Sequence, residues 1–108
     1  MSHHIPDNWV IIKIKGDAPH YRVLAGWSGG YTQGSSWKLN SGITQMVRKD
    51  DYYLISGQSG SMYMCHKEAY GLRLNNAYVW QQLVDKYGEK VELMEELTDW
   101  STMDWIIG

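Results

Sequence analysis

The chain has 108 residues, of which 44% are hydrophobic and 20% charged, and its formal net charge is −2. These values are typical of a globular protein of one domain, so residues 1–108 are interpreted as a single domain. The acidic balance disfavours nonspecific binding to nucleic acid backbones, no apolar run reaches the roughly 18 residues that a membrane helix needs, and a single cysteine excludes an internal disulfide.

Five segments share alternating apolar residues bounded by turn residues, and they are predicted to be strands: 9–15, 21–27, 37 to about 48, 52–56 and 61–67. In the second of these, Tyr21, Val23, Ala25 and Trp27 fall on one face, and Arg22 falls on the other. The third contains Asn-Ser-Gly at 40–42, which favours a bulge or bend within one strand.

The pattern becomes helical after residue 74. Asn75 or Asn76 is a candidate N-cap, apolar residues recur at helical spacing, and Gly88 is a candidate end of the helix. Residues 90–97 are ambiguous, and alternation favours a strand although Glu and Met favour a helix. The expected fold class is α+β, a strongly bent, barrel-like antiparallel sheet of five to six strands with one C-terminal helix.

No arrangement of residues for catalysis or metal binding is evident. Cys65 and His66 are neighbours in a predicted strand, so their side chains point to opposite faces and do not form a nucleophile–base pair. The histidines lie far apart in the sequence, and no metal-ligand spacing or calcium loop is present. We therefore expect no catalytic residues, no metal and no cofactor, in a protein that is not an enzyme.

The composition favours ligand binding over catalysis. Six Trp and eight Tyr occur without any Phe, so every aromatic side chain carries a hydrogen-bonding group, as suits pockets and interfaces. Lineage bias explains the missing Phe equally well. Residues 1–74 hold eight Lys and Arg against five Asp and Glu, whereas residues 75–108 hold two against seven. An anionic ligand is therefore expected to prefer the first part of the chain.

The stretch 25–37, AGWSGGYTQGSSW, is the main candidate for ligand contact. It lacks the Gly-Lys-Ser/Thr end of a P-loop, so it offers backbone N–H groups, hydroxyls and aromatic platforms instead. The alternative is a simple turn or bent strand in which Trp27 and Trp37 stack across paired strands. In a single meander, the second Gly- and Ser-rich turn at 57–60 would lie at the same end of the sheet and flank the same site.

The candidate ligand-binding residues lie on this stretch or on predicted strands near it. They are Arg22, Trp27, Ser28, Tyr31, Ser36, Trp37, Asn40 and His66. Arg22 would supply positive charge to a phosphate, but its parity directs it to the face opposite Trp27. A homo-oligomer with the site at a subunit boundary would remove this objection.

Four segments carry a family resemblance: NWVIIKI, YRVLAGWSGGY, GSSWKLNSGI and YYLISGQSGSMYMCHKEAYGL. Over residues 8–72 the chain resembles small uncharacterised accessory proteins encoded by tailed bacteriophages. The resemblance carries over no catalytic residues. It implies an accessory protein made in the host bacterial cytoplasm, where such proteins often bind and block host machinery and some sequester nucleotide signals of host immunity.

Three functions follow from these observations. The first is a non-catalytic, counter-defence sponge that binds and sequesters a nucleotide-like small molecule. The second is an inhibitor that binds a host protein through exposed aromatic residues. The third is a single-stranded nucleic acid binder, against which the net charge counts. No membrane partner is expected, and the ligand, the host target and the oligomeric state are left open by the sequence.

Overall fold

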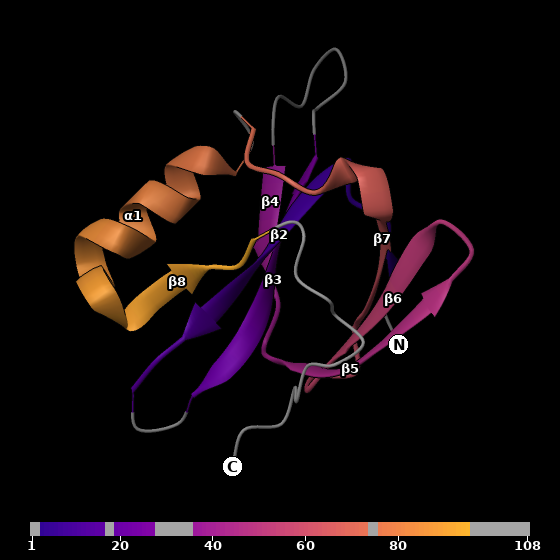
Figure 1. Ribbon diagram of the computed structural model, residues 1–108, viewed down its shortest axis with the longest axis horizontal. Helices are drawn as coiled ribbons and strands as arrows, with labels where there is room; N and C mark the ends of the chain where they lie inside the picture. Colours follow the sequence, from indigo (N-terminus) through magenta and orange to yellow (C-terminus); the bar gives the residue numbers. More distant parts are fainter. Residues whose placement is uncertain (1–2, 17–18, 28–35, 74–75, 96–108) are drawn as a thin grey trace.

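The computed structural model describes residues 3–16, 19–27, 36–73 and 76–95, and these form three layers (Figure 1). Sheet A has the strand order β1-β7-β6-β5, and sheet B has the order β4-β3-β2-β8. Helix α1 covers one face of sheet B, and sheet A lies against the other face. Sheet B is therefore the middle layer.

The elements are bounded as follows. Sheet A contains β1 (His3–His4), β5 (Ile43–Lys49), β6 (Tyr52–Gly57) and β7 (Met62–His66). Sheet B contains β2 (Asn8–Ile14), β3 (His20–Trp27), β4 (Ser36–Leu39) and β8 (Val91–Leu93). Helix α1 spans Ala77–Tyr87, and two short 3-10 helices, η1 (Lys67–Ala69) and η2 (Gly88–Lys90), follow β7 and α1. The named strands pair antiparallel, except that β1 runs parallel to β7.

Strand β2 is buried on both faces. Trp9 and Ile11 are fully buried against sheet A, and Val10 and Ile12 are buried against α1 and β8. A continuous apolar run such as Trp-Val-Ile-Ile is typical of a strand that is covered on both faces. A strand with one solvent-exposed face instead alternates apolar and polar residues.

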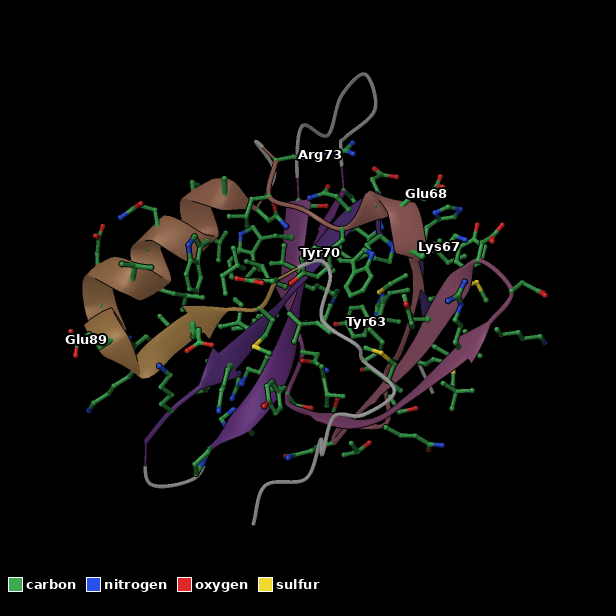
Figure 2. All side chains as sticks on the ribbon, in the orientation of Figure 1. Tyr63, Lys67, Glu68, Tyr70, Arg73 and Glu89 are labelled. Carbon is green, nitrogen blue, oxygen red and sulfur yellow. The ribbon has the colours of Figure 1, made fainter. Side chains whose placement is uncertain are left out.

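Tyr70 completes the second edge of β2. One edge of β2 pairs with β3 along its whole length, and the other pairs with β8 only from Ile12 onward. Before that point, the Tyr70 hydroxyl accepts a hydrogen bond from the Ile11 N–H and donates one to the Met94 carbonyl, and the Gly71 N–H donates to the Trp9 carbonyl over 2.8 Å. Figure 2 shows Tyr70 in the interior, where its hydroxyl replaces a missing strand partner.

Two apolar cores lie on the two sides of sheet B. The larger core lies between the sheets and includes Tyr21, Val23 and Ala25 of β3, with Trp27 packed against it. This confirms the predicted face of that strand. Across this core, the Trp9 indole N–H donates to the His66 carbonyl of β7 over 2.8 Å. The smaller core joins sheet B to α1 and includes Leu24 and Val79.

The predicted strand 37–48 is two strands in two sheets. The chain leaves sheet B after Leu39 and enters sheet A at Ile43, so residues 40–42 form a bend between two strands, a corner, and not a bulge or bend within one strand. Gly42 has a φ of 139°, a conformation that favours glycine. Its carbonyl accepts a hydrogen bond from the Gln58 N–H over 2.9 Å, which joins the corner to the β6–β7 turn.

The α+β class, the mostly antiparallel pairing and the single described helix are confirmed. The expectation of one strongly bent, barrel-like sheet is wrong, because the strands form two separate sheets with free edges at β5 and β4 among the described residues. The corner at 40–42 and the late return of β8 to β2 account for the difference.

The helix follows its sequence signals closely. It begins after Asn76 and ends before Gly88, whose φ of 58° and N–H bond to the Val84 carbonyl end the helix as predicted. Asn76 makes no capping bond with its side chain. Instead it is fully buried, and its Oδ1 accepts from the Asn8 Nδ2 over 3.1 Å and from the Arg73 N–H over 2.9 Å. The start of α1 is thereby tied to β2.

The substitution Tyr70→Phe tests whether the Tyr70 hydroxyl completes the second edge of β2. It keeps the ring but removes the acceptor of the Ile11 N–H and the donor to the Met94 carbonyl. We expect the free energy of unfolding to fall by about 1–3 kcal/mol in urea denaturation. The control Tyr78→Phe alters a tyrosine that is 49% exposed on α1 and should change stability by less than about 0.5 kcal/mol. Equal effects of the two substitutions would contradict the role of Tyr70.

Candidate functional site

A cavity of about 300 Å³ lies where the end of α1 meets sheet B, and we call it the α1 cavity. Its floor is aliphatic, and basic side chains and one phenol stand around it. The lining consists of Ile14, Lys15, Gly16, Arg22, Leu39, Leu83, Tyr87, Lys90 and Val91. A mostly apolar hollow of this volume with a few polar groups is typical of small-molecule sites.

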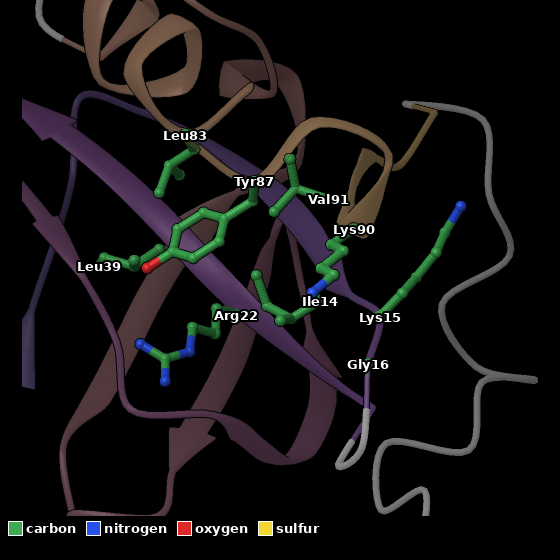
Figure 3. Close-up of a pocket in the computed structure, with 9 residues that line it drawn as sticks. All are labelled: Ile14, Lys15, Gly16, Arg22, Leu39, Leu83, Tyr87, Lys90 and Val91. Carbon is green, nitrogen blue, oxygen red and sulfur yellow. The ribbon is translucent and has the colours of Figure 1, made fainter. Parts of the chain in front are cut away.

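Arg22 is the central polar group of the α1 cavity. Its Nε donates to His20 Nε2 over 2.9 Å, and it forms no ion pair with any carboxylate of the described residues. In Figure 3 the guanidinium of Arg22 and the hydroxyl of Tyr87 lie on the same side of the cavity, next to Leu39. The terminal nitrogens of Arg22 are therefore placed to meet an anion beside an aromatic ring.

The two lysines that line the α1 cavity, Lys15 and Lys90, differ in their interactions. Lys15 Nζ pairs with Glu92 Oε1 at 2.9 Å, and its side chain extends away from Arg22 (Figure 3). The hydrogen bond and charge of Lys15 hold the pKa of Glu92 below its ordinary value. Lys90 lines the cavity from η2, and Tyr87 is 44% exposed at the end of α1. A ligand would thus meet Arg22, Lys90 and the Tyr87 ring before it met Lys15.

A second, shallower depression of about 350 Å³ lies beside β4, and we call it the β4 cleft. Its lining brings together three of the predicted ligand-binding residues with three neighbours that were not predicted. The residues are His4, Ile5, Trp27, Ser36, Trp37 and Lys38. The Trp27 indole N–H donates to the Ile5 carbonyl over 2.9 Å, so this indole is anchored to the N-terminal segment.

Trp27 and Trp37 are not cross-strand partners. The register pairs Trp27 with Ser36 and Trp37 with Gly26. Because directly opposed residues share a face, the two tryptophans project to opposite faces of the β3–β4 pair. Trp27 packs against the core between the sheets, whereas Trp37 is 42% exposed on the face that carries Arg22 and Leu39. The alternative of stacking across paired strands therefore does not apply.

Asn40 is buried at the corner between the sheets. Its backbone N–H donates to the Val23 carbonyl over 3.0 Å, and its side-chain Oδ1 accepts from the Val23 N–H over 2.7 Å. The side-chain oxygen thus takes the place of a backbone carbonyl and accepts the hydrogen bond of the Val23 N–H of β3 at the point where β4 ends. Asn40 is 4% exposed, and Gly57 leaves room for its amide, because a Cβ there would lie 3.2 Å from Asn40 Nδ2.

His66 lies away from both depressions. Its Nδ1 accepts from the Glu68 N–H over 3.1 Å at the start of η1, and its ring meets the Tyr52 ring edge-on at a centroid distance of 5.0 Å. Its neighbour Cys65 is fully buried in the core between the sheets, and burial raises the pKa of its thiol. The prediction that Cys65 and His66 face opposite sides is confirmed.

The candidate residues Ser28 and Tyr31 lie outside the described residues. Trp27 and Ser36, which flank that segment, pair at one end of β4. The second Gly- and Ser-rich turn instead contacts the corner that follows the other end of β4, where the Ser59 N–H donates to Ser41 Oγ over 3.0 Å. The strand pairs β3–β4 and β6–β7 lie in different sheets, so the single meander assumed for the two stretches is not present.

Sequence reasoning predicted Arg22 but missed the rest of its surroundings. Its parity argument is confirmed, since Arg22 and Trp27 line different depressions. Tyr87, Lys90 and Val91 reach the α1 cavity from the end of α1, from η2 and from β8, far along the chain. The available signal in the sequence was an aromatic residue, Tyr87, directly before the helix-ending Gly88.

Comparison of the chain with protein-family models, with curated proteins and with solved structures found no match. Within the described part of the chain, no three His, Cys, Asp or Glu residues gather as metal ligands, and no helix has the length and hydropathy to cross a membrane. The fold and the two depressions are therefore the basis for assigning a function.

The substitution Asn40→Ala tests whether Asn40 holds the corner together. It removes the acceptor of the buried Val23 N–H, so we expect a loss of about 1–3 kcal/mol in the free energy of unfolding. Gln82→Ala, on the exposed side of α1, is the control and should remain within about 0.5 kcal/mol of the parent protein in the same urea titration. An unchanged midpoint for Asn40→Ala would contradict this role.

The thiol of Cys65 should be unreactive in the folded protein. Because burial disfavours the thiolate and blocks access, a chromogenic disulfide reagent should modify Cys65 only as fast as the protein opens. Full and rapid modification is expected in denaturing urea. Reaction of the native protein at the rate of a free thiol would show that the core between the sheets is open.

Proposed function

We propose that this protein binds and retains a nucleotide-like small molecule, and that the α1 cavity is the site. The observation that carries the proposal is the placement of Arg22. Arg22, a half-buried residue over an aliphatic floor with no carboxylate partner among the described residues, favours an anionic ligand that supplies a counter-charge.

The other groups of the α1 cavity specify more than an anion. Leu39, Leu83 and Val91 provide an apolar floor, and Tyr87 offers an exposed aromatic ring beside the guanidinium. A ligand with a planar ring and a phosphate would match both features, since the ring packs on the apolar side and the phosphate meets Arg22 and Lys90. This combination favours a nucleotide over a simple inorganic anion.

The proposed role is sequestration. The lining of the α1 cavity offers cations, a phenol and aliphatic side chains, all of which suit retention of a ligand. The resemblance to phage accessory proteins supplies a setting in which such retention is a function, because a sponge lowers the free concentration of a host signal without transforming it.

Thermal denaturation with a panel of cyclic and linear nucleotides tests the proposal. A ligand that binds only the folded state raises Tm in proportion to its excess over Kd, so at least one nucleotide should raise Tm in a concentration-dependent way. Pyrophosphate, which has the charge but no ring, should give a smaller shift. Absence of a shift with every nucleotide of the panel would overturn the proposed function.

Arg22→Gln then tests the site. Loss of a charge-assisted contact should weaken nucleotide binding by about tenfold or more in isothermal titration calorimetry. The matched control is Arg48→Gln, because Arg48 is an exposed arginine on β5 that lines neither depression. Equal affinities for Arg22→Gln and the parent protein would place the ligand elsewhere.

A further inference from the structure

The α1 cavity and the β4 cleft share one short strand. Leu39 lines the α1 cavity, whereas Ser36, Trp37 and Lys38 line the β4 cleft. These four residues make up the whole of β4. On the face of β4 that carries Leu39, the next side chain along the strand toward the β4 cleft is Trp37.

The register places the Trp37 side chain within reach of such a ligand. Leu39 is paired with Leu24 and Trp37 with Gly26, so both β4 side chains project to the face that carries Arg22. Side chains two residues apart on a strand are separated by about 7 Å. The exposed Trp37 indole thus stands one side-chain position beyond the apolar floor of the α1 cavity, opposite a glycine that contributes no side chain.

The outer edge of β4 offers hydrogen-bond donors between the two depressions. The Asn40 N–H donates to the Val23 carbonyl, so it points toward β3. Because successive backbone groups of a strand alternate in direction, the N–H groups of Trp37 and Leu39 point to the opposite, outer side. β4 is an edge strand of sheet B, so these donors have no strand partner among the described residues.

Lys38 adds a cation near the same edge of β4. It is exposed, follows Trp37 and precedes Leu39 in the chain, and therefore projects to the opposite face of the strand, where it forms no ion pair with a described residue. The outward N–H groups alternate with outward carbonyls, so each donor can meet one oxygen of a bridging phosphate, and the long Lys38 side chain near this edge supplies a counter-charge. The exposed indole beyond them suits a second planar base, since stacking on an aromatic side chain is tolerant of base identity.

We infer that the ligand of this protein is a dinucleotide or a similar two-base molecule rather than a mononucleotide. One nucleotide unit occupies the α1 cavity at Arg22, the bridging phosphate crosses the outer edge of β4, and the second base stacks on Trp37. This inference rests on the proposed function and makes it more specific, because it assigns the size class of the ligand and gives Trp37 a role that mononucleotide binding does not need.

The test compares ligand length by isothermal titration calorimetry at one fixed salt concentration. The probes are the four nucleoside 5′-monophosphates and the four linear, 5′-phosphorylated homodinucleotides. A dinucleotide should bind about tenfold or more tightly than its mononucleotide, because the stacked second base adds affinity. In Trp37→Ala this advantage should disappear while the mononucleotide affinity stays unchanged, and Trp37→Phe should retain most of it.

Tyr78→Ala is the matched control, because Tyr78 is also an exposed aromatic residue and lines neither depression. It should leave the affinities for both ligand lengths unchanged. Equal affinity of the parent protein for the two lengths would overturn this inference and leave the proposed function standing. A loss of mononucleotide affinity in Trp37→Ala would also overturn it. Failure of every probe to bind would remove both the proposed function and this inference.

Discussion

The burial of β2 on both faces is the constraint on which the rest of the structure depends. Four consecutive apolar side chains, from Trp9 to Ile12, are withdrawn from water, and a strand in this position needs cover on each side and a hydrogen-bond partner along each edge. Sheet A and α1 supply the two covers. β3 supplies one edge, and the other is assembled from β8, Met94, Gly71 and the hydroxyl of Tyr70.

This layering also creates the α1 cavity. Helix α1 has 11 residues and packs through Val79 on β2 and β3, so it ends before it covers the part of sheet B where the β2–β3 hairpin begins. Arg22 belongs to the face that α1 would otherwise cover. A position that continues the core pattern of β3 is thus occupied by a cation, which the helix end leaves open to solvent beside Tyr87.

Much of the local structure could be predicted from the sequence, because the patterns that indicate strands and helices extend over only a few residues. The face of β3, the opposite directions of Arg22 and Trp27, and the bounds of α1 all follow from periodicity and from Gly88. The pairing of β8 with β2 and of β1 with β7 depends on residues far apart in the chain, and no local pattern encodes it. The α1 cavity could not be predicted from the sequence for the same reason, since Tyr87 and Lys90 lie around one cavity with Arg22 only when β8 has paired with β2. The parity of the apolar residues also continues across residues 40–42, so Asn-Ser-Gly was the available sign of the change of sheet, and it fits a bend within one strand equally well.

The second edge of β2 is completed by segments from late in the chain, and this has a consequence for folding during synthesis. The strand is translated well before Tyr70, Gly71, β8 and Met94, which complete its second edge. Contacts between such distant segments form slowly and cannot form on a partial chain. During synthesis a strand with four consecutive apolar residues is therefore paired along one edge only, and its unpaired edge is open to aggregation until the later segments have been made.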